Sequence, residues 1–270
     1  MVEKDLISIV TVTYNCEEVL EDTIHSVISQ TYSNIEYIII DGNSSDGTLD
    51  IIQKYESHLS TFISEPDKGI YDAMNKGIEH AHGKWINFMN AGDTFYSKDA
   101  VTDFVSNILN DTVIAYGDSM IWLKDVHYLR PHFSIDCLKM SMCIPHQSTF
   151  VRTDYHKKNL FDISFHSSGD FDFFHRAYVF HNVRFQYIPM IVSNFDGETG
   201  MSKDNYEIVW KEDRLILGKS ICGWHALGFR LRVILKSLKN RIKKFIPSNY
   251  NRKLKQKNLC KKGIVLIKNT

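Results

Sequence analysis

Two apolar runs near the start of the chain constrain its fold more than any other feature. Residues 7–13 (ISIVTVT) and 35–40 (IEYIII) are short, β-branched and apolar at successive positions. This pattern is typical of strands buried on both faces of a parallel sheet. Apolar residues at helical spacing follow each run, over 17–30 and through Ile52 and Tyr55. Two successive strand–helix units predict an α/β fold with a doubly wound, mostly parallel sheet flanked by helices.

The alternation of strands and helices continues to about residue 98 and is looser beyond it. After a turn at 41–47, the expected elements are a strand at 61–64, a helix at 71–81, a strand at 85–89, a helix from 99 to 109, strands at 113–116 and 119–123, a loop through Pro131 and Pro145, and a helix from 170 to 180. In such sheets ligands bind outside the carboxyl ends of the strands. Those ends carry the polar or acidic segments 14–15, Asp41, 65–69 and 90–93. We therefore expect these four segments to converge on one ligand site.

Carboxylates at these strand ends could hold a divalent cation. Mg²⁺ or Mn²⁺ is commonly held by one or two carboxylates together with substrate phosphates. Asp93 is the best single candidate by position. Taken alone, Asp93, Asp41 and Asp46 could equally be turn or helix-capping acids, because Asp is frequent in both places.

Five segments taken in order resemble a known family. They are 8–15 (SIVTVTYN), 38–48 (IIIDGNSSDGT), 65–77 (EPDKGIYDAMNKG), 88–93 (FMNAGD) and 168–176 (SGDFDFFHR). Together they are similar to family 2 glycosyltransferases of the GT-A fold, a Rossmann-like nucleotide-diphospho-sugar transferase fold, over roughly residues 6–202. The third and fourth segments look like the branch that builds bacterial capsule, exopolysaccharide or O-antigen units.

The resemblance implies a nucleotide-sugar donor, with a UDP-sugar favoured because UDP is common in the family. Thr13, Tyr14 and Asn15 would line the nucleoside pocket. Asp41 would accept a hydrogen bond from the base, for example from N3–H of uracil. The residues that the resemblance assigns to the nucleotide-sugar site are Thr13, Tyr14, Asn15, Asp41, Asp67, Lys68, Asn75, Asn90, Ala91, Gly92 and Asp93.

The same resemblance places Mn²⁺ or Mg²⁺ on Asp93, where the metal would neutralise charge on the departing nucleotide. Asn90 and Gly92 stand where acids are common in the family, so the protein's share of the metal site rests on Asp93. Met74 stands where many relatives have an arginine. Charge on the diphosphate must then be met elsewhere, and the candidates are Lys68, Lys76 and Arg176.

Asp170 matches the family's catalytic base, which takes the proton of the acceptor hydroxyl as that hydroxyl attacks the anomeric carbon. Its alternative role is helix capping, since Ser168-Gly169 precedes it at the start of an apolar helix. Asp172 falls on another face of that helix and is expected to be structural. His146, either a site residue or an interior histidine, and the loop 194–202, with two glycines that could close over the donor, are weaker candidates.

Charge is distributed unevenly along the chain. The 32 basic and 32 acidic residues cancel, but 15 of the basic residues lie between Lys219 and Lys268, a segment that contains no acid. Apolar residues at helical spacing over 224–245 predict a basic amphipathic helix. It could lie on an anionic membrane surface or pack on the domain with a solvated face. Nucleic acid is not expected as a partner, because no recognised motif or aromatic platform is present.

The composition also limits the compartment. The five cysteines are odd in number and lack CxxC spacing, which argues against a disulfide framework and a zinc site. No cleavable signal and no run of about 20 apolar residues is visible. We expect a cytoplasmic protein, which could be peripheral on the cytoplasmic face of the inner membrane.

The expectation from sequence is an inverting hexosyl- or N-acetylhexosaminyl-transferase of bacterial surface polysaccharide biosynthesis, with a glycan or polyprenyl-linked acceptor. Its GT-A domain would span 1–217, with a donor half at about 1–98 and an acceptor half at about 99–217, followed by a basic helical extension at 218–270. A nucleotidyltransferase, for which a glycine-rich basic loop would be expected after the first strand, and a non-catalytic nucleotide- or glycan-binding module remain the alternatives. A Rossmann dehydrogenase is excluded, because no GxGxxG follows the first strand.

Overall fold

Four parallel strands form the first part of the sheet. The computed structural model describes residues 4–123, 126–197, 206–220 and 266–267. Within them β1 (Ile7–Thr13) pairs in parallel with β2 (Ile35–Asp41) on one side and with β4 (Trp85–Phe88) on the other. β3 (Thr61–Ser64) pairs in parallel with β2. The carboxyl ends of all four strands therefore lie at one edge, as the sequence predicted.

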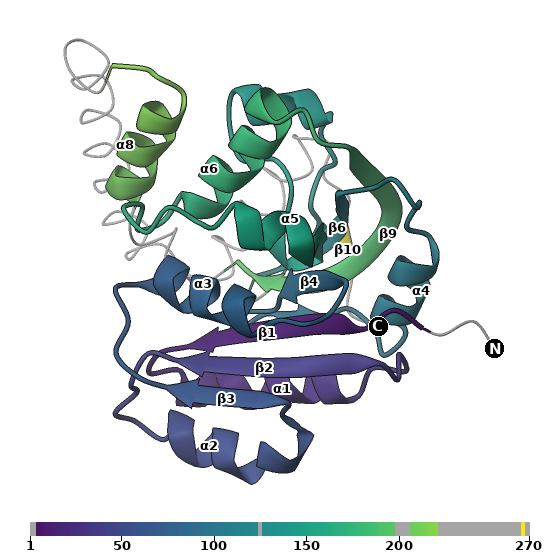
Figure 1. Cartoon of the computed structure of the whole chain (residues 1–270), viewed down its shortest axis with the longest axis vertical. Coiled ribbons are helices and arrows are strands. Elements are labelled where there is room, and N and C mark those ends of the chain that lie inside the picture. The colour runs from purple at the N-terminus through teal and green to yellow at the C-terminus, as the bar shows by residue number, and fades with distance from the viewer. Residues whose placement is uncertain (1–3, 124–125, 198–205, 221–265, 268–270) are drawn as a thin grey trace.

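Helices cover both faces of these strands because apolar side chains of each strand alternate between the two faces. Ile7 and Ile9 pack in the cluster that contains α1 (Glu17–Ile28), α2 (Thr48–Lys54) and α4 (Ala100–Ser106). Val10 and Val12 pack in the cluster that contains α3 (Ile70–His80) and α6 (Gly169–His175). Figure 1 shows α3 and α6 on the side of the sheet opposite to α2.

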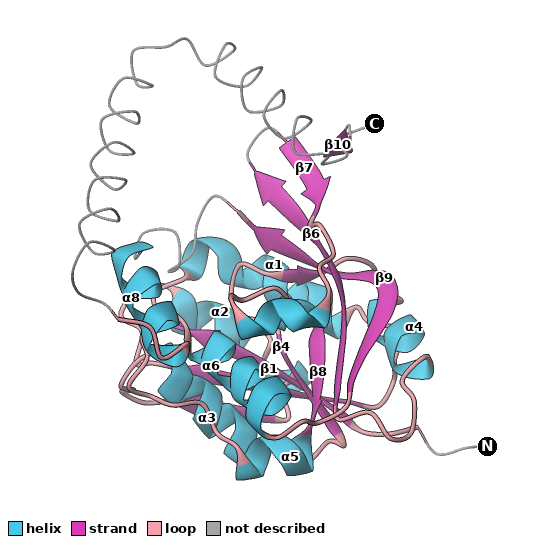
Figure 2. Ribbon diagram, turned by 90° about the horizontal axis from the view of Figure 1, so that it is seen from above, coloured by secondary structure: helices cyan, strands magenta, loops and turns pink. Residues whose placement is uncertain are grey.

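The second part of the sheet is mostly antiparallel. Its strands are β5 (Thr94–Phe95), β6 (Ile114–Leu123), β7 (Val126–Leu129), β8 (Thr149–Arg152), β9 (Phe185–Asp196) and β10 (Leu266–Ile267). β8 pairs antiparallel with both β4 and β6, so it joins the two parts. β6 also pairs antiparallel with β7 and in parallel with β9, and these strands lie side by side at one end of the sheet (Figure 2). Over the described strands the order is β10-β7-β6-β8-β4-β1-β2-β3.

The remaining described helices, apart from one after α2, belong to the second part of the chain. They are α5 (Thr153–Lys158), a π-helical turn that continues α6 (Arg176–Phe180), α8 (Tyr206–Ile216) and short 3-10 helices at Glu56–His58, Ile135–Lys139 and His146–Ser148. None of the helices in the described part of the chain is both long and apolar enough to span a bilayer. The predicted basic helix at 224–245 lies outside the described residues.

The predicted α/β fold is confirmed, and the predicted elements before residue 98 match to within a few residues. The strands expected at 113–116 and 119–123 are one strand, β6, whose pairing with β9 shifts register around Gly117 and Asp118. β8, β9, α5 and α8 had no counterpart among the expected elements. The second part of the sheet is mixed rather than parallel, because strands from distant segments pair there.

Candidate active site

The residues predicted to line the nucleoside pocket lie where β1 and β2 end. Tyr14, the residue after β1, is 66% exposed. A Cβ atom placed on Gly42 would lie 2.4 Å from Oδ2 of Asp67 and 3.4 Å from the ring of Tyr14. Gly42 therefore leaves the space that the Asp67 carboxylate occupies. An exposed aromatic ring and a carboxylate flank the same position, which suits a planar, hydrogen-bonding ligand.

Asp41, predicted to accept a hydrogen bond from the base, is fully buried. Its carboxylate accepts bonds from the hydroxyls of Thr13 (2.9 Å), Ser44 (2.5 Å) and Ser64 (2.7 Å), and from the backbone N–H of Ser44 (2.9 Å). Burial raises the pKa of Asp41, but these hydrogen bonds outweigh it and hold the pKa below its usual value. Protein donors thus contact both carboxylate oxygens, and the predicted bond from a base to Asp41 stays a prediction. Asp41 holds the loop after β2 in place.

The loop after β1 is tied to the same network. The Asn15 backbone N–H donates to the hydroxyl of Ser44 (2.9 Å), and Asn15 Oδ1 accepts from the backbone N–H of Ser45 (2.8 Å). Asn15 has a φ of 46°, in the left-handed region that Asn tolerates better than most residues. Thr13 and Asn15 thus fix the backbone on either side of Tyr14.

The three candidate cations for the diphosphate differ in what surrounds them. Lys76 pairs with Glu65 (2.7 Å) and bonds a backbone carbonyl. Arg176 pairs with Asp172 (2.7 Å) and also bonds a backbone carbonyl. Lys68 is exposed, and its ammonium has no partner among the described residues. Of the three, Lys68 is the one whose charge is available to a ligand.

Two residues of the quoted motifs make close contacts with other parts of the fold. Asn75, predicted to bind the nucleotide sugar, is buried on α3, and its amide makes two hydrogen bonds of 2.9 Å with the backbone of Phe161. Both ends of the amide bond a segment 86 residues away, and its assignment to the nucleotide-sugar site stays a prediction. Asp172 is buried in its ion pair with Arg176, as its expected structural role requires.

The turn after β4 carries Asn90, Ala91, Gly92 and the buried Asp93. The hydroxyl of Thr23 on α1 accepts from Gly92 N–H (3.0 Å) and donates to the Asp93 carbonyl (2.8 Å), which fixes this turn. Asn90 Oδ1 is buried and has no hydrogen-bond partner in the described part of the chain. Among the described residues, no three His, Cys, Asp or Glu side chains are placed to hold a metal by themselves. A cation here would need ligand oxygens besides the Asp93 carboxylate.

Asp170 lies at the start of α6, where three groups surround its carboxylate. Oδ1 accepts hydrogen bonds from the Phe171 backbone N–H (2.8 Å) and from the Tyr71 hydroxyl (3.3 Å). Oδ2 lies 3.3 Å from Nδ1 of His146. The Asp170 side chain remains 17% exposed. Burial raises the pKa of Tyr71 well above its ordinary value, so that hydroxyl stays protonated and can donate.

Close packing fixes the distance between Tyr71 and Asp170. A Cβ atom on Gly169 would lie 2.9 Å from carbons of the Tyr71 ring. Only glycine at this position allows α6 to approach α3 so closely. Tyr71 lies inside the motif 65–77 but had no predicted role, because an aromatic residue on an amphipathic helix is ordinarily a core residue.

His146 connects the two halves of the site. Its Nδ1 faces Asp170, and its Nε2 lies 3.4 Å from Nδ2 of Asn90. The His146 side chain is 25% exposed, so its imidazole is half-buried. The weak prediction that His146 belongs to the site gains a geometric reason, because it bridges the turn after β4 and the start of α6.

Helix α8 fixes the segment that leads into α6. Glu212 is buried and accepts hydrogen bonds from the backbone N–H groups of His166, Ser167 and Ser168 (2.7–2.9 Å). Asp213 accepts from the Ser168 hydroxyl (2.8 Å), and burial raises its pKa. Both acids lie beyond the motifs, so no sequence signal indicated that they support the position of Asp170.

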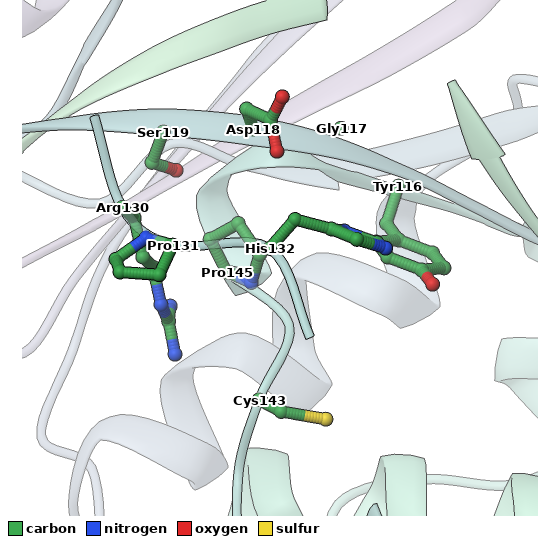
Figure 3. A pocket seen from close by; sticks show the side chains of 9 residues that line it. All are labelled: Tyr116, Gly117, Asp118, Ser119, Arg130, Pro131, His132, Cys143 and Pro145. Carbon is green, nitrogen blue, oxygen red and sulfur yellow. The ribbon is translucent and has the colours of Figure 1, made fainter. Parts of the chain in front are cut away.

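A pocket missed by the sequence analysis opens on β6. It is lined by residues 116–119 of β6, residues 130–132 after β7, and Cys143 and Pro145 before the 3-10 helix at His146–Ser148 (Figure 3). The pocket contains about 220 Å³ of space that continues into open solvent. In Figure 3 the Arg130 side chain extends away from β6, whereas Asp118 stays beside it.

Comparison with known proteins decides the family. The model of the family described as Glycosyl transferase family 2 matches residues 8–179. The chain belongs to glycosyl transferase family 2. This family 2 enzyme is therefore a glycosyltransferase, and the nucleotidyltransferase alternative is not supported.

Relatives in this family carry the same activity in their names. A PGL/p-HBAD biosynthesis glycosyltransferase of Mycobacterium bovis is 28% identical over 236 residues, which cover 85% of this chain and 89% of that protein. An uncharacterized glycosyltransferase of Mycobacterium tuberculosis is 31% identical over 66% of this chain and 70% of that protein. The putative teichuronic acid biosynthesis glycosyltransferase TuaG of Bacillus subtilis is 39% identical over 33% of this chain and 37% of that protein.

Solved structures of low sequence identity share the fold. TarS 1–349 of S. aureus in complex with UDP-GlcNAc superposes with a TM-score of 0.60 at 20% identity, over 78% of this chain and 65% of that one. The mannosyltransferase PcManGT of Pyrobaculum calidifontis, in complex with GDP-Man and Mn²⁺, gives 0.59 at 13% identity, over 79% and 61%. The chain spans less than two thirds of either structure. The likeness confirms the GT-A fold of this enzyme.

Proposed function

We propose that this glycosyltransferase moves a sugar from a nucleoside diphosphate donor, a UDP-sugar in particular, to an acceptor hydroxyl with inversion at the anomeric carbon. The donor half lies at about 1–98 and the acceptor half at about 99–217. One observation carries the proposal: the Asp170 carboxylate lies beside His146, which also contacts Asn90 of the turn that ends at Asp93. A base candidate and the turn expected at the donor diphosphate thus face one site.

The reaction needs one base and one leaving group. The acceptor oxygen attacks the anomeric carbon from the face opposite the nucleotide, the bond from that carbon to the phosphate oxygen breaks, and the nucleoside diphosphate leaves with the electron pair. Asp170 takes the proton of the acceptor hydroxyl. An alcohol is far less acidic than a carboxylic acid, so the proton moves late, once the oxygen has begun to bond to the sugar. Tyr71 and His146 keep the carboxylate oriented by contacts at 3.3 Å.

On the donor side, Asp67 takes the role that the sequence suggested for Asp41. Its Oδ1 accepts from the Gly69 backbone N–H (2.8 Å), and Oδ2, beside Gly42 and the Tyr14 ring, accepts no hydrogen bond from the described residues. A base that presents an N–H, such as N3–H of uracil, can donate to this oxygen while its ring packs on Tyr14. Cytosine presents an acceptor at that position and would be disfavoured. Lys68 supplies positive charge nearby.

A divalent cation, Mn²⁺ or Mg²⁺, fits the donor end of the site. Asp93 would hold it together with phosphate oxygens, and the unpartnered Asn90 Oδ1 is a further hard oxygen in the same turn. When bound, the cation supplies positive charge to the leaving diphosphate. The Mn²⁺ in the PcManGT complex supports this part of the proposal.

The names of the relatives support an acceptor in cell-surface glycan assembly, carried on a glycan or a lipid. They include enzymes of PGL/p-HBAD and of teichuronic acid biosynthesis. The transferred group is then a hexosyl or an N-acetylhexosaminyl group, and the UDP-GlcNAc bound to TarS supports the second.

Thermal shift with UDP, GDP, CDP and TDP, each with Mn²⁺ or with EDTA, tests the donor class. The expected result is a metal-dependent rise in melting temperature with UDP that is lost in Asp67→Asn and Asp93→Ala. If only GDP raises the melting temperature, the proposed donor becomes a GDP-sugar. If the rise is the same with EDTA as with Mn²⁺, the metal is no longer part of the proposal. Proton NMR of the product then reads the anomeric configuration, and retention of the donor configuration would reject inversion.

A further inference from the structure

Arg130 is the one strongly basic group that lines the pocket on β6. Its side chain makes no hydrogen bond or ion pair with any residue that the structure describes. Burial lowers the pKa of Arg130, and the nearby Cys143 thiol and Asp170 carboxylate offset part of that effect. A guanidinium that has lost part of its hydration without gaining a partner is unfavourable. An anion with two oxygens matches its planar fork of donors.

The pocket lies on the acceptor side of the site. Pro145, which lines it, directly precedes His146, whose imidazole contacts Asp170. In the sheet, β6 is separated from β1 by β8 and β4, so the pocket is remote from the Tyr14–Asp67 end. A group bound by Arg130 would therefore belong to the molecule whose hydroxyl reaches Asp170.

The other polar groups of the pocket are occupied. Asp118 accepts a hydrogen bond from the Tyr187 hydroxyl (2.9 Å), and burial raises its pKa. The exposed His132 ring stacks on Tyr187 (centroids 3.9 Å apart) and on Tyr116 (6.4 Å). His132 and Tyr116 line the same pocket as Arg130, and an aromatic ring offers a flat face on which part of a sugar can pack.

We propose that the pocket on β6 binds an anionic group of the acceptor, a phosphate or a carboxylate, through Arg130, and so positions the acceptor hydroxyl beside Asp170. The inference rests on the proposed function, because it takes Asp170 as the base. The pocket is open and shallow, so it holds the charged group while the rest of the acceptor extends into solvent. The enzyme would then select acidic acceptors over neutral ones.

Two sources could supply that anionic group: the diphosphate of a lipid-linked acceptor or the carboxylate of an acidic sugar. Farnesyl diphosphate and phenyl β-D-glucuronide represent them, and phenyl β-D-glucoside is the neutral counterpart. Binding of each probe is measured by calorimetry in EDTA without donor. The proteins are wild type, Arg130→Gln, Arg130→Lys, Lys68→Gln, which tests the donor diphosphate site, and Arg184→Gln, a surface arginine paired with Asp111.

We expect one of the anionic probes to bind the wild type more tightly than the glucoside. Arg130→Gln should weaken that probe about 10- to 100-fold, the range for a hydrogen-bonded charge pair, whereas Arg130→Lys should retain part of the affinity. Arg184→Gln should bind like wild type. The probe that responds identifies the source. The inference is overturned if Arg130→Gln leaves both anionic probes unchanged, if Lys68→Gln alone weakens farnesyl diphosphate, or if neither probe binds.

A stability measurement separates binding from a structural role. Since Arg130 has no partner in the described part of the chain, Arg130→Gln should leave the melting temperature unchanged or higher, and a fall of several degrees would mark Arg130 as structural. Failure of the proposed function looks different: no nucleotide sugar would be turned over by the wild type, whatever the probes do. Failure of this inference leaves donor turnover intact and removes only the dependence of probe binding on Arg130.

Discussion

The two ends of the site treat their carboxylates in opposite ways. Asp41, at the end of β2, is fully buried and receives four short hydrogen bonds from protein donors. Asp170, at the start of α6, keeps part of its surface exposed and has one short bond, to its neighbour Phe171, with its other contacts at 3.3 Å. Both residues belong to family motifs. Their surroundings differ accordingly: protein donors hold the Asp41 carboxylate in the framework, whereas the Asp170 carboxylate keeps an open side.

This difference shows how to tell a structural acid from a reactive one when both lie in motifs. Each hydrogen bond from a fixed donor stabilises the charged form of a carboxylate and makes it a poorer base. A carboxylate with few short bonds and an open side can meet a ligand. Mutations at the two ends should therefore separate loss of stability from loss of rate.

The largest expected effect is on the rate at Asp170. Asp170→Asn should lower kcat for transfer about 10²- to 10⁴-fold, because the amide cannot accept the proton, while donor affinity stays within about twofold. Steady-state kinetics with fixed donor measures it. Asp172→Asn is the matched control, since Asp172 pairs with Arg176, and it should keep most of the activity. Near wild-type turnover in Asp170→Asn would remove Asp170 from the mechanism.

The next effect is on stability at Asp41. Asp41→Ala removes the acceptor of the buried Thr13 and Ser44 hydroxyls, of the Ser64 hydroxyl and of one backbone N–H. It should lower the free energy of unfolding by about 3 kcal/mol, or the melting temperature by about 10 °C. Asp67→Ala removes a half-buried carboxylate, should cost less than about 1 kcal/mol and should act on nucleotide affinity instead. Urea denaturation compares them. Equal losses of stability in the two variants would mean that Asp41 is no more important to the framework than Asp67.

The dependence of stability on pH should follow Asp41. Its pKa is lower folded than the unfolded value of about 3.9, so its contribution is fully present above that value and is lost as pH falls through the folded pKa. Denaturation of wild type and Asp41→Asn between pH 3 and pH 6 should show a gap that narrows below about pH 4. A constant gap would mean that the Asp41 charge contributes nothing to stability.

His146 lies between Asp170 and Asn90, and two substitutions separate these contacts. His146→Asn would place an amide near the position of Nδ1 and keep a contact with Asp170, whereas His146→Gln would reach toward the position of Nε2 and Asn90. We expect His146→Gln to lower kcat about 10-fold, as for the loss of one hydrogen bond to a charged group, and His146→Asn to lower it less. Steady-state kinetics of the two variants compares them. If His146→Asn lowers kcat more than His146→Gln, His146 acts through its contact with Asn90 in the turn after β4.

The smallest effect is expected at Tyr71. Tyr71→Phe removes only the hydroxyl that donates to Asp170 at 3.3 Å, and the ring still packs on Gly169. The rate should fall about two- to fivefold, because a long hydrogen bond contributes little, with the melting temperature nearly unchanged. A drop as large as that of Asp170→Asn would make the tyrosine hydroxyl part of the proton transfer itself.

The predictable part of the site is the part that local sequence encodes. Strands buried on both faces have a signal within seven residues, and β1 and β2 were predicted almost to the residue. The segment that carries Asp170 was recognised because its motif is contiguous, and the role of Asp170 as the base stays a prediction. The second part of the sheet was not, since β8 and β9 pair with strands from distant segments and carry no periodicity that separates them from loops.

The sequence by itself determined that this chain folds as α/β, where its parallel strands lie and which motifs line their ends. Only the tertiary structure decided which groups each motif residue contacts. Asp41 is occupied by Thr13 and Ser64, which lie 28 and 23 residues away. Asn75 is bound by a segment 86 residues away, and Arg130 has no partner in the described residues. The physical reason is that strand formation depends on neighbours in the chain, whereas the availability of a polar group depends on which donors and acceptors the fold brings to it.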